Sequence, residues 1–196
     1  MSKSYSKIKR LLDILLSFLL IVFCFIPMVL ISLWIFLVSP GKVFFSQKRY
    51  GYGGKPFSCF KFRTMKRSAP HDVPARSIPE VWSYFIPGGG FLRKSGLDEL
   101  PQLFNILAGK MSFVGPRPCM LSESALYQQR LSLGVFKVRP GLTGYAQTNN
   151  RSLTDDNVKA TLDAYYVQHM NFSFDAKLFF KTFAVVFSHS SRKKKK

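Results

Sequence analysis

Acidic residues and cysteines are scarce in this chain of 196 residues. Its 10 Asp and Glu residues face 29 Lys and Arg residues, and the formal charge of +19 favours anionic partners such as phosphorylated ligands, acidic lipid or nucleic acid. The three cysteines, Cys24, Cys59 and Cys119, lack metal-ligand spacing and cannot complete a disulfide framework. A reducing compartment is the simplest interpretation. The sequence contains no internal repeat.

Apolar side chains are abundant by contrast, at 47% of the chain with 15% aromatic, which excludes a disordered polycation. The length suits one domain with an appendage. Residues 14–38 form a run of 25 positions without a charge. As a helix this run would be about 37 Å long, enough to cross a hydrocarbon core with tilt. It exceeds the apolar part of a signal peptide and no small-residue cleavage site follows, so we expect it to stay in the membrane.

Two arrangements of segment 14–38 are compatible with its flanks. Basic residues near a span mark its cytoplasmic side, but four precede this segment and three follow it. Pro27 lies near the middle and removes a backbone hydrogen bond, and a helix that dips into one leaflet and returns would accommodate this break. A Pro-kinked helix that crosses is the alternative, since membrane helices tolerate proline. The flanking cations are Lys3, Lys7, Lys9 and Arg10, then Lys42, Lys48 and Arg49.

The remainder of the chain has the pattern of a mostly helical α+β domain. Alternating character predicts short strands at 42–47 and 57–64, with glycines turning the chain between them. Residues 68–90 are rich in proline and glycine, which indicates mainly loop. Apolar positions at i, i+3, i+4 and i+7 predict an amphipathic helix from Asp98 to Gly109. Further helices are predicted at 123–133, 155–169 and 175–188.

The last predicted helix, 175–188, is densely aromatic and also carries Lys177 and Lys181. Such a helix can lie in the membrane surface. Packing against the core of its own domain is an equally good interpretation of the periodicity.

Two adjacent carboxylates, Asp98 and Glu99, begin one predicted helix. Capping alone would explain them, because backbone N–H groups and the helix dipole stabilise negative charge there. However, Arg93 lies just before them, Arg117 stands between two prolines, and Arg139 precedes a Pro-Gly turn. Arginines fixed in rigid turns suit bidentate phosphate contacts. A carboxylate beside a phosphate needs a divalent cation, so this set indicates phosphoryl transfer on a lipid substrate.

Four blocks then match a known signature: 61–65 (KFRTM), 97–105 (LDELPQLFN), 111–118 (MSFVGPRP) and 138–144 (VRPGLTG). In this order they closely resemble bacterial sugar transferases of the monotopic phosphoglycosyl transferase class, in its minimal form. The similarity runs from about residue 9 to residue 187.

The resemblance implies a monotopic membrane protein. Its N-terminal segment would be a re-entrant helix broken at a proline, which Pro27 resembles, and its cytoplasmic catalytic domain would carry interfacial amphipathic helices. The corresponding division of the chain is a membrane helix in 1–40, a catalytic domain in 41–190 and a basic tail in 191–196.

The same resemblance implies a two-step reaction. Asp98 would be the nucleophile that attacks the β-phosphate of a UDP-sugar, releasing UMP and leaving a phosphosugar on the aspartate. Undecaprenyl phosphate, or another polyprenyl phosphate, would then accept the phosphosugar. Glu99 matches the residue that helps to hold Mg²⁺, for which Mn²⁺ is a possible substitute.

Five basic residues correspond to positions that the family uses around phosphate and substrate. Arg93 and Arg117 are expected to contact phosphate, and Lys61 and Arg139 to line the active site. Arg151 stands in an Asn-Asn-Arg sequence where Asn-Gly-Arg is usual.

The implied location is the inner leaflet of the bacterial cytoplasmic membrane, with the catalytic domain on the cytoplasmic face. Glycosyltransferases that act later in glycoconjugate assembly are possible partners, and nucleic acid is not expected as one. Three further features depart from the family: Ile26 replaces a serine that commonly precedes the proline, Gly96 stands where Ser or Thr is usual, and residues 85–90 lack the basic residues common in relatives.

Two alternatives differ in mechanism. In the first, the chain is a membrane-anchored basic protein that binds anionic lipid or nucleic acid without catalysis; the absence of a recognisable nucleic-acid motif argues against it. In the second, Asp98 only binds metal and the lipid acceptor attacks the donor directly. Only the two-step enzyme predicts a stoichiometric burst of UMP without acceptor.

Overall fold

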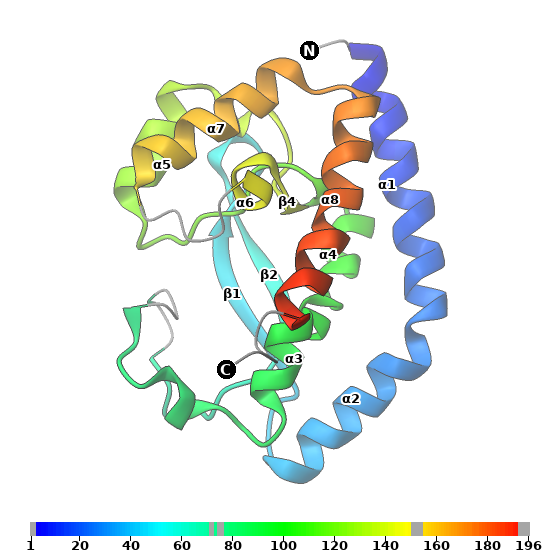
Figure 1. Ribbon diagram of the computed structural model, residues 1–196, viewed down its shortest axis with the longest axis vertical. Helices are drawn as coiled ribbons and strands as arrows, with labels where there is room; N and C mark the ends of the chain where they lie inside the picture. The colour runs from blue at the N-terminus through cyan, green and yellow to red at the C-terminus, as the bar shows by residue number, and fades with distance from the viewer. Residues whose placement is uncertain (1–2, 71–72, 74–76, 150–154, 192–196) are drawn as a thin grey trace.

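The computed structural model describes residues 3–70, 73, 77–149 and 155–191, and Figure 1 shows their arrangement. This part of the chain contains eight α-helices and two small sheets of two strands each. The predicted mostly helical α+β class is therefore confirmed.

The apolar N-terminal segment forms two helices. Helix α1 (Lys3–Phe23) and helix α2 (Phe25–Val38) meet at Cys24, with a bend of 59° between them. Figure 1 shows α1 along one side of the molecule and α2 turning beneath it. Among the described residues no single helix has the length and apolar character to cross a membrane, whereas the bent pair has both when its halves are taken together. A broken span and a re-entrant loop both have this shape.

Pro27 lies in the first turn of α2, three residues after the break. Its ring would collide with the carbonyl of Phe23 in a continuous helix, and its missing N–H cannot bond that carbonyl. Helical hydrogen bonds continue on both sides, from the Cys24 N–H to Leu20 O and from the Met28 N–H to Cys24 O, each at 2.8 Å. The bend thus falls about one turn before the proline, where its ring acts.

The two faces of α1 differ in character. Asp13 and Ser17 are buried against the rest of the protein. Phe18, Leu19 and Val22 are exposed, at 56%, 62% and 61%. The inward face thus combines these polar groups with Leu16, Leu20 and Ile21, which pack against the main core, while the outward face is apolar and exposed.

Strands β1 (Phe44–Tyr50) and β2 (Pro56–Phe62) form an antiparallel hairpin in which Phe45 lies opposite Lys61. A 3-10 turn, η1 (Tyr52–Gly54), connects the strands. The two predicted strands are confirmed, with β1 displaced toward the C-terminus because the chain is bent at Gly41, before the strand begins.

A short segment after the hairpin carries the two carboxylates. It consists of η3 (Val81–Tyr84), α3 (Gly89–Ser95), η4 (Leu97–Glu99) and α4 (Gln102–Leu107). The helix predicted from Asp98 to Gly109 is thus divided in two. Pro101 stands between the parts and has no N–H to donate, so the 3-10 turn does not extend into α4.

The C-terminal half supplies a second sheet and a helical layer. Strand β3 (Ser112–Val114) pairs in parallel with β4 (Gly141–Thr143), which brings two of the recognised sequence blocks together. The helices are α5 (Ser124–Ser132), η5 (Val135–Lys137), α6 (Tyr145–Asn149), α7 (Asp156–His169) and α8 (Phe172–Ser191). The predicted helices at 123–133 and 155–169 match α5 and α7 closely, and α8 begins three residues before its predicted start.

Helix α8 uses one face for the core. Leu178 is buried, and the ring of Phe179 meets that of Phe113 edge to face at 5.9 Å. Phe180 on another face is 69% exposed. Core packing therefore accounts for part of its aromatic content, and an outward apolar side chain remains for contact with a surface.

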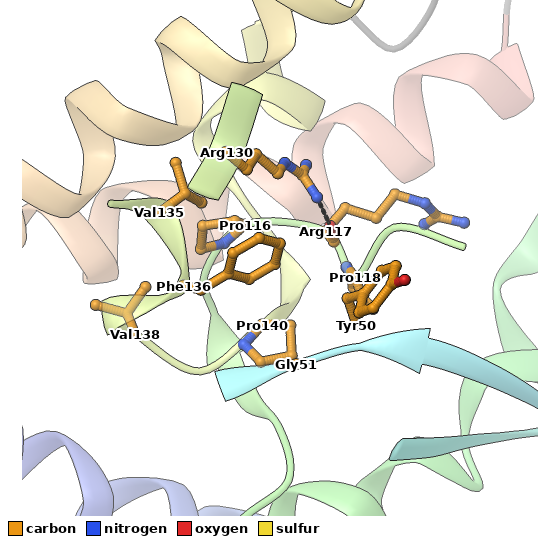
Figure 2. A pocket seen from close by; sticks show the side chains of 10 residues that line it. All are labelled: Tyr50, Gly51, Pro116, Arg117, Pro118, Arg130, Val135, Phe136, Val138 and Pro140. Atoms are coloured by element: carbon orange, nitrogen blue, oxygen red, sulfur yellow. Dashed lines mark hydrogen bonds between the residues drawn. The ribbon is translucent and has the colours of Figure 1, made fainter. Parts of the chain in front are cut away.

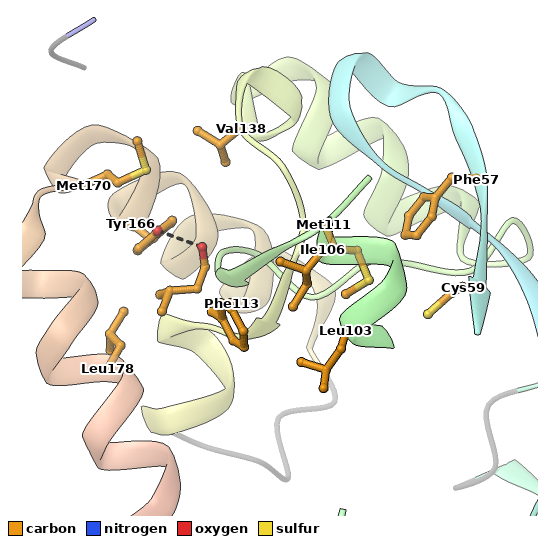
Figure 3. Packing of buried hydrophobic residues seen from close by; sticks show 11 residues of the cluster. Phe57, Cys59, Leu103, Ile106, Met111, Phe113, Val138, Tyr166, Met170 and Leu178 are labelled. Atoms are coloured by element: carbon orange, nitrogen blue, oxygen red, sulfur yellow. Dashed lines mark hydrogen bonds between the residues drawn. The ribbon is translucent and has the colours of Figure 1, made fainter. Parts of the chain in front are cut away.

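The main core fixes α4. Figure 3 shows Leu103 and Ile106 of α4 near Phe113 of β3, with Tyr166 of α7 on the far side of the cluster. The Tyr166 hydroxyl donates to the carbonyl of Val114 at 3.1 Å, so the one polar atom of this large buried ring is paired.

Helix α1 is hydrogen-bonded into this domain. Asp13 accepts from the Ser112 hydroxyl and from the Phe113 N–H, both at 3.1 Å. Arg10 donates to the carbonyls of Ile106 and Leu107, at 2.7 and 2.8 Å, and so caps the C-terminal end of α4. These bonds join α1, which leads to the apolar bend, to α4, which follows the two carboxylates.

Candidate active site

The two adjacent carboxylates differ in their surroundings. Both lie in η4, which begins after Gly96, a residue with a left-handed φ of 77°. Asp98 is only 5% exposed, whereas the Glu99 side chain is 26% exposed. Glu99 Oε1 lies 2.5 Å from Lys61 Nζ on β2. The tight turn therefore aims one carboxylate inward and the other toward the hairpin.

The pKa values of Asp98 and Glu99 shift in opposite directions. Burial raises the pKa of Asp98 to about 6, with the neighbouring charge of Glu99 adding to the rise and the charge of Lys61 opposing it. Burial also acts to raise the pKa of Glu99, but the charges of Lys61 and Arg117 prevail and lower it to about 2. Near neutral pH both groups are ionised, Glu99 firmly and Asp98 by a small margin. Adjacent carboxylates with divergent pKa values are typical of catalytic sites.

Three of the predicted basic residues surround this pair. Lys61 bonds Glu99 directly. Arg93 on α3 and Arg117 both act to lower the pKa of Asp98, which places them within electrostatic reach of it. Both are exposed, and neither guanidinium is bonded to a carboxylate in the described residues. Two cations are thus available to an anionic ligand beside the carboxylates.

Arg139, which the family resemblance implied lines the active site, makes its contacts at the C-terminal end of α4. Its Nε donates to the carbonyl of Gly109 at 2.8 Å, and its guanidinium lies 5.9 Å from the ring centre of Tyr52. It thus lies at the end of α4 opposite the carboxylates, beside Arg10, whose pKa it lowers after the larger effect of burial. The contacts of Arg139 are those of a helix-capping residue. Arg151 lies outside the described residues.

Arg49 on β1 is a site residue that sequence reasoning did not select. It donates to the carbonyl of Pro118 at 2.9 Å and to Gln47 Oε1 at 2.8 Å. Its charge contributes to the low pKa of Glu99. In the sequence it was only one of the cations after the apolar run. Its spacing of two from Gln47, on one face of a strand, was the available signal.

Three glycines, Gly115, Gly141 and Gly144, allow the backbone next to the Pro-Arg-Pro turn to lie directly against that of β4 and the residues around it. A Cβ built on Gly115 would lie 2.5 Å from the Arg139 carbonyl, and one on Gly141 only 2.1 Å from the Gly115 N. One on Gly144 would lie 2.3 Å from the Gly115 carbonyl. A side chain at any of them would push the two blocks apart. A small pocket, lined by the turn together with Tyr50, adjoins this contact (Figure 2).

The donor set of the site fits a magnesium ion that is only partly held by protein. Among the described residues no group of three or more His, Cys, Asp and Glu side chains could hold a metal ion. Mg²⁺ commonly binds one or two carboxylates and takes its other ligands from water and substrate phosphates. Glu99, which is partly exposed and ionised near neutral pH, could supply one such ligand.

The sequence profile described as "Bacterial sugar transferase" matches residues 4–189, which is nearly the whole chain. The protein belongs to the bacterial sugar transferase family.

Individual relatives are similar over the same region. The UDP-glucose:undecaprenyl-phosphate glucose-1-phosphate transferase of Escherichia coli K12 is 38% identical over 185 residues, covering 89% of this chain and 39% of the relative. An uncharacterized sugar transferase of Haemophilus influenzae is 35% identical, covering 91% of this chain and 41% of the relative. The chain thus spans about two fifths of these two relatives. The sugar transferase EpsL of Bacillus subtilis is 36% identical, covering 87% of this chain and 83% of EpsL.

Proposed function

We propose that the protein transfers a sugar-1-phosphate from a UDP-sugar to undecaprenyl phosphate and releases UMP. The observation that carries the proposal is the buried Asp98, whose pKa is about 6, beside Glu99 and within reach of Lys61, Arg93 and Arg117. Two relatives support the choice of substrates. The name of the Escherichia coli relative specifies undecaprenyl phosphate and glucose-1-phosphate. A relative from Salmonella typhimurium, 31% identical over 198 residues, is named undecaprenyl-phosphate galactose phosphotransferase.

Asp98 is the nucleophile in the first step. One of its carboxylate oxygens forms a bond to the β-phosphorus of the donor while the bond from that phosphorus to the bridging oxygen breaks. The bridging oxygen leaves with the electron pair as part of UMP. A carboxylate is a weak nucleophile, so positioning and neutralisation of the phosphate supply most of the acceleration. Burial of Asp98 removes the water that would otherwise surround its charge.

The second step returns the enzyme to its starting state. A phosphate oxygen of undecaprenyl phosphate attacks the same phosphorus, and the Asp98 oxygen departs as carboxylate. No net proton transfer is needed in either step. One site can therefore serve a soluble donor and a membrane-bound acceptor in turn.

The cations have distinct tasks in this scheme. Lys61 keeps Glu99 ionised and orients its carboxylate through an ion pair, with Nζ 2.5 Å from Oε1. Arg93 and Arg117, which are exposed, contact the phosphates of the donor. Mg²⁺, or Mn²⁺ in its place, would be held by Glu99 and would offset the charge of the diphosphate when bound. Activity should accordingly be lost in excess EDTA and restored by added Mg²⁺.

The membrane placement belongs to the same proposal. The bent pair α1–α2 enters the inner leaflet of the cytoplasmic membrane and returns, so the catalytic domain stays on the cytoplasmic face. The acceptor's phosphate lies at that interface. The product would pass to glycosyltransferases that act later in assembly of a bacterial glycoconjugate.

The experiment is UMP release by purified protein from a panel of UDP-sugars, beginning with UDP-glucose and UDP-galactose. With no lipid acceptor, we expect a burst of at most one UMP per protein; with undecaprenyl phosphate, we expect turnover. Turnover with acceptor but no burst without it would instead support direct attack by the acceptor, with Asp98 as a metal ligand. Absence of UMP release under both conditions would favour a non-catalytic role in binding anionic lipid.

A further inference from the structure

Consecutive backbone carbonyls of the Pro-Arg-Pro turn are each held from a different part of the protein. The carbonyl of Pro116 accepts from the Gly141 N–H at 2.9 Å. That of Arg117 accepts from Arg130 Nη1 at 2.7 Å, and that of Pro118 from Arg49 Nη1 at 2.9 Å. The two prolines have no N–H, so the turn can be fixed from outside chiefly through its carbonyls.

Arg130 is the most deeply buried of these donors. It lies on α5 and is 4% exposed, and its Nη2 lies 2.5 Å from Asp163 Oδ2 on α7, which is 1% exposed. Figure 2 shows Arg130 reaching the backbone of Arg117 while the Arg117 side chain points away from it. The guanidinium of Arg130 therefore uses Nη2 for the ion pair with Asp163 and Nη1 for the carbonyl of Arg117 in the turn.

In this arrangement the backbone of Arg117 is hydrogen-bonded to Arg130, while the Arg117 side chain is exposed. The carbonyl of Arg117 is fixed, whereas its own guanidinium is exposed and lies close enough to Asp98 and Glu99 to affect both. We infer that Arg130, anchored by Asp163, is a positioning residue that holds the turn so that Arg117 faces the carboxylate pair. The inference rests on the proposed function for the role of Arg117 toward phosphate.

Lysine cannot replace arginine in this task. Its single ammonium can keep the ion pair with Asp163, but it lacks the planar fork that reaches a second acceptor in a fixed direction. A shift of about 1 Å in a positioning group can cost a hundredfold in rate. For Arg130→Lys we expect kcat/KM for UMP release to fall about tenfold, since the turn keeps its bonds to Gly141 and Arg49.

A double-mutant cycle separates positioning from stability. If Arg130 acts through Arg117, adding Arg130→Lys to Arg117→Ala should lower kcat/KM by less than about twofold further. The same fold loss in both backgrounds would overturn the inference. Leu126→Ala is the control, because Leu126 is buried on α5 in a cluster with Cys119 and Ala160 and makes apolar contacts there, with no hydrogen bond to the turn. It should lower Tm at least as much as Arg130→Lys while kcat/KM changes less.

A second readout does not depend on activity. Hydrogen exchange of a peptide covering 111–121 reports the amides that flank the turn, among them the Gly115 N–H, bonded to Thr143 O, and the Met120 N–H, bonded to Glu123 Oε2. We expect these amides to exchange faster in Arg130→Lys and to change less in Leu126→Ala. Unchanged exchange in Arg130→Lys overturns the positioning role, even if the wild type releases no UMP and the proposed function fails. Should Arg130→Lys fold poorly, Arg130→Met with Asp163→Leu removes both buried charges together and should loosen the turn in the same way.

Discussion

The ammonium group of Lys61 lies 2.5 Å from Oε1 of Glu99 and joins the β1–β2 hairpin to the turn that carries both carboxylates. Both side chains are mostly buried, with 21% and 26% exposed, so removal of either partner would leave the other charge poorly solvated. The pair also sets the charge of the site, because Lys61 lowers the pKa of both Glu99 and Asp98.

Lys61→Met should therefore lower both stability and activity. We expect a loss of about 1–3 kcal/mol in the free energy of unfolding, because the mostly buried Glu99 loses its charged hydrogen-bond donor. We expect kcat/KM for UMP release to fall by about a hundredfold, since a group that orients and neutralises the reacting pair is gone. Denaturant unfolding and UMP release on the same preparation measure both. A large loss of stability together with a small loss of activity would show that the pair is structural.

The acidity of Asp98 predicts the pH dependence of the reaction. Its pKa is raised to about 6, chiefly by burial, and only the ionised carboxylate attacks phosphorus. The rate of the UMP burst should fall tenfold for each pH unit below about 6 and level off above it. The Lys61→Met substitution should move this inflection to higher pH, since Lys61 acts to lower the pKa of Asp98. An inflection near 4 would show that Asp98 is solvated.

The raised pKa of Asp98 also predicts that the stability of the protein depends on pH. In the folded state this pKa exceeds the ordinary value of 3.8, so the folded protein binds the proton more tightly and loses stability as pH rises from about 4 to 6. Above that window the cost is up to about 3 kcal/mol at about 1.4 kcal/mol per pKa unit. Asp98→Asn should thus be more stable than the wild type at pH 8 and about equal at pH 4. Lower stability of this variant at pH 8 would contradict the assignment.

A third prediction concerns the attachment of α1. Asp13 is buried and accepts hydrogen bonds from Ser112 and Phe113 across 3.1 Å each. Asp13→Ala leaves both donors without that acceptor and should cost about 2–4 kcal/mol. Asp156→Ala, which removes a partly exposed ion pair with Lys159, is the control and should cost less than about 1 kcal/mol. Equal Tm values for the two variants would mean that the Asp13 hydrogen bonds do not contribute to the attachment of α1.

A fourth prediction concerns topology. If α1–α2 is re-entrant, a cysteine placed at Ser2 or Ser4, with the native cysteines replaced, should not react with an impermeant maleimide added outside intact cells. Pro27→Leu restores a donor for the Phe23 carbonyl and should straighten the pair toward a span, so that the label then reacts. Labelling from outside without the Pro27 substitution would establish a crossing helix and leave the catalytic proposal intact.

The sequence was sufficient for features that depend on neighbours along the chain. Adjacent Asp98 and Glu99, the Arg117 turn and the two hairpin strands follow from spacing and turn residues alone. The family resemblance added Lys61 as a partner for the carboxylates, and the structure places it beside Glu99.

Features that depend on distant backbone were beyond the sequence. Arg139 bonds a carbonyl 30 positions away, and Arg49 bonds one 69 positions away, so neither contact leaves a local pattern. The break before α2 likewise lies one turn from Pro27, because a proline acts on the carbonyl four residues earlier.

Intact-protein mass spectrometry after incubation with a UDP-sugar, in the absence of lipid acceptor, tests the central claim most directly. The account predicts wild-type protein heavier by one phosphosugar, a reduced fraction in Glu99→Gln and no adduct in Asp98→Asn. Addition of undecaprenyl phosphate should remove the adduct. An adduct that persists in Asp98→Asn would contradict the assignment of Asp98 as the nucleophile.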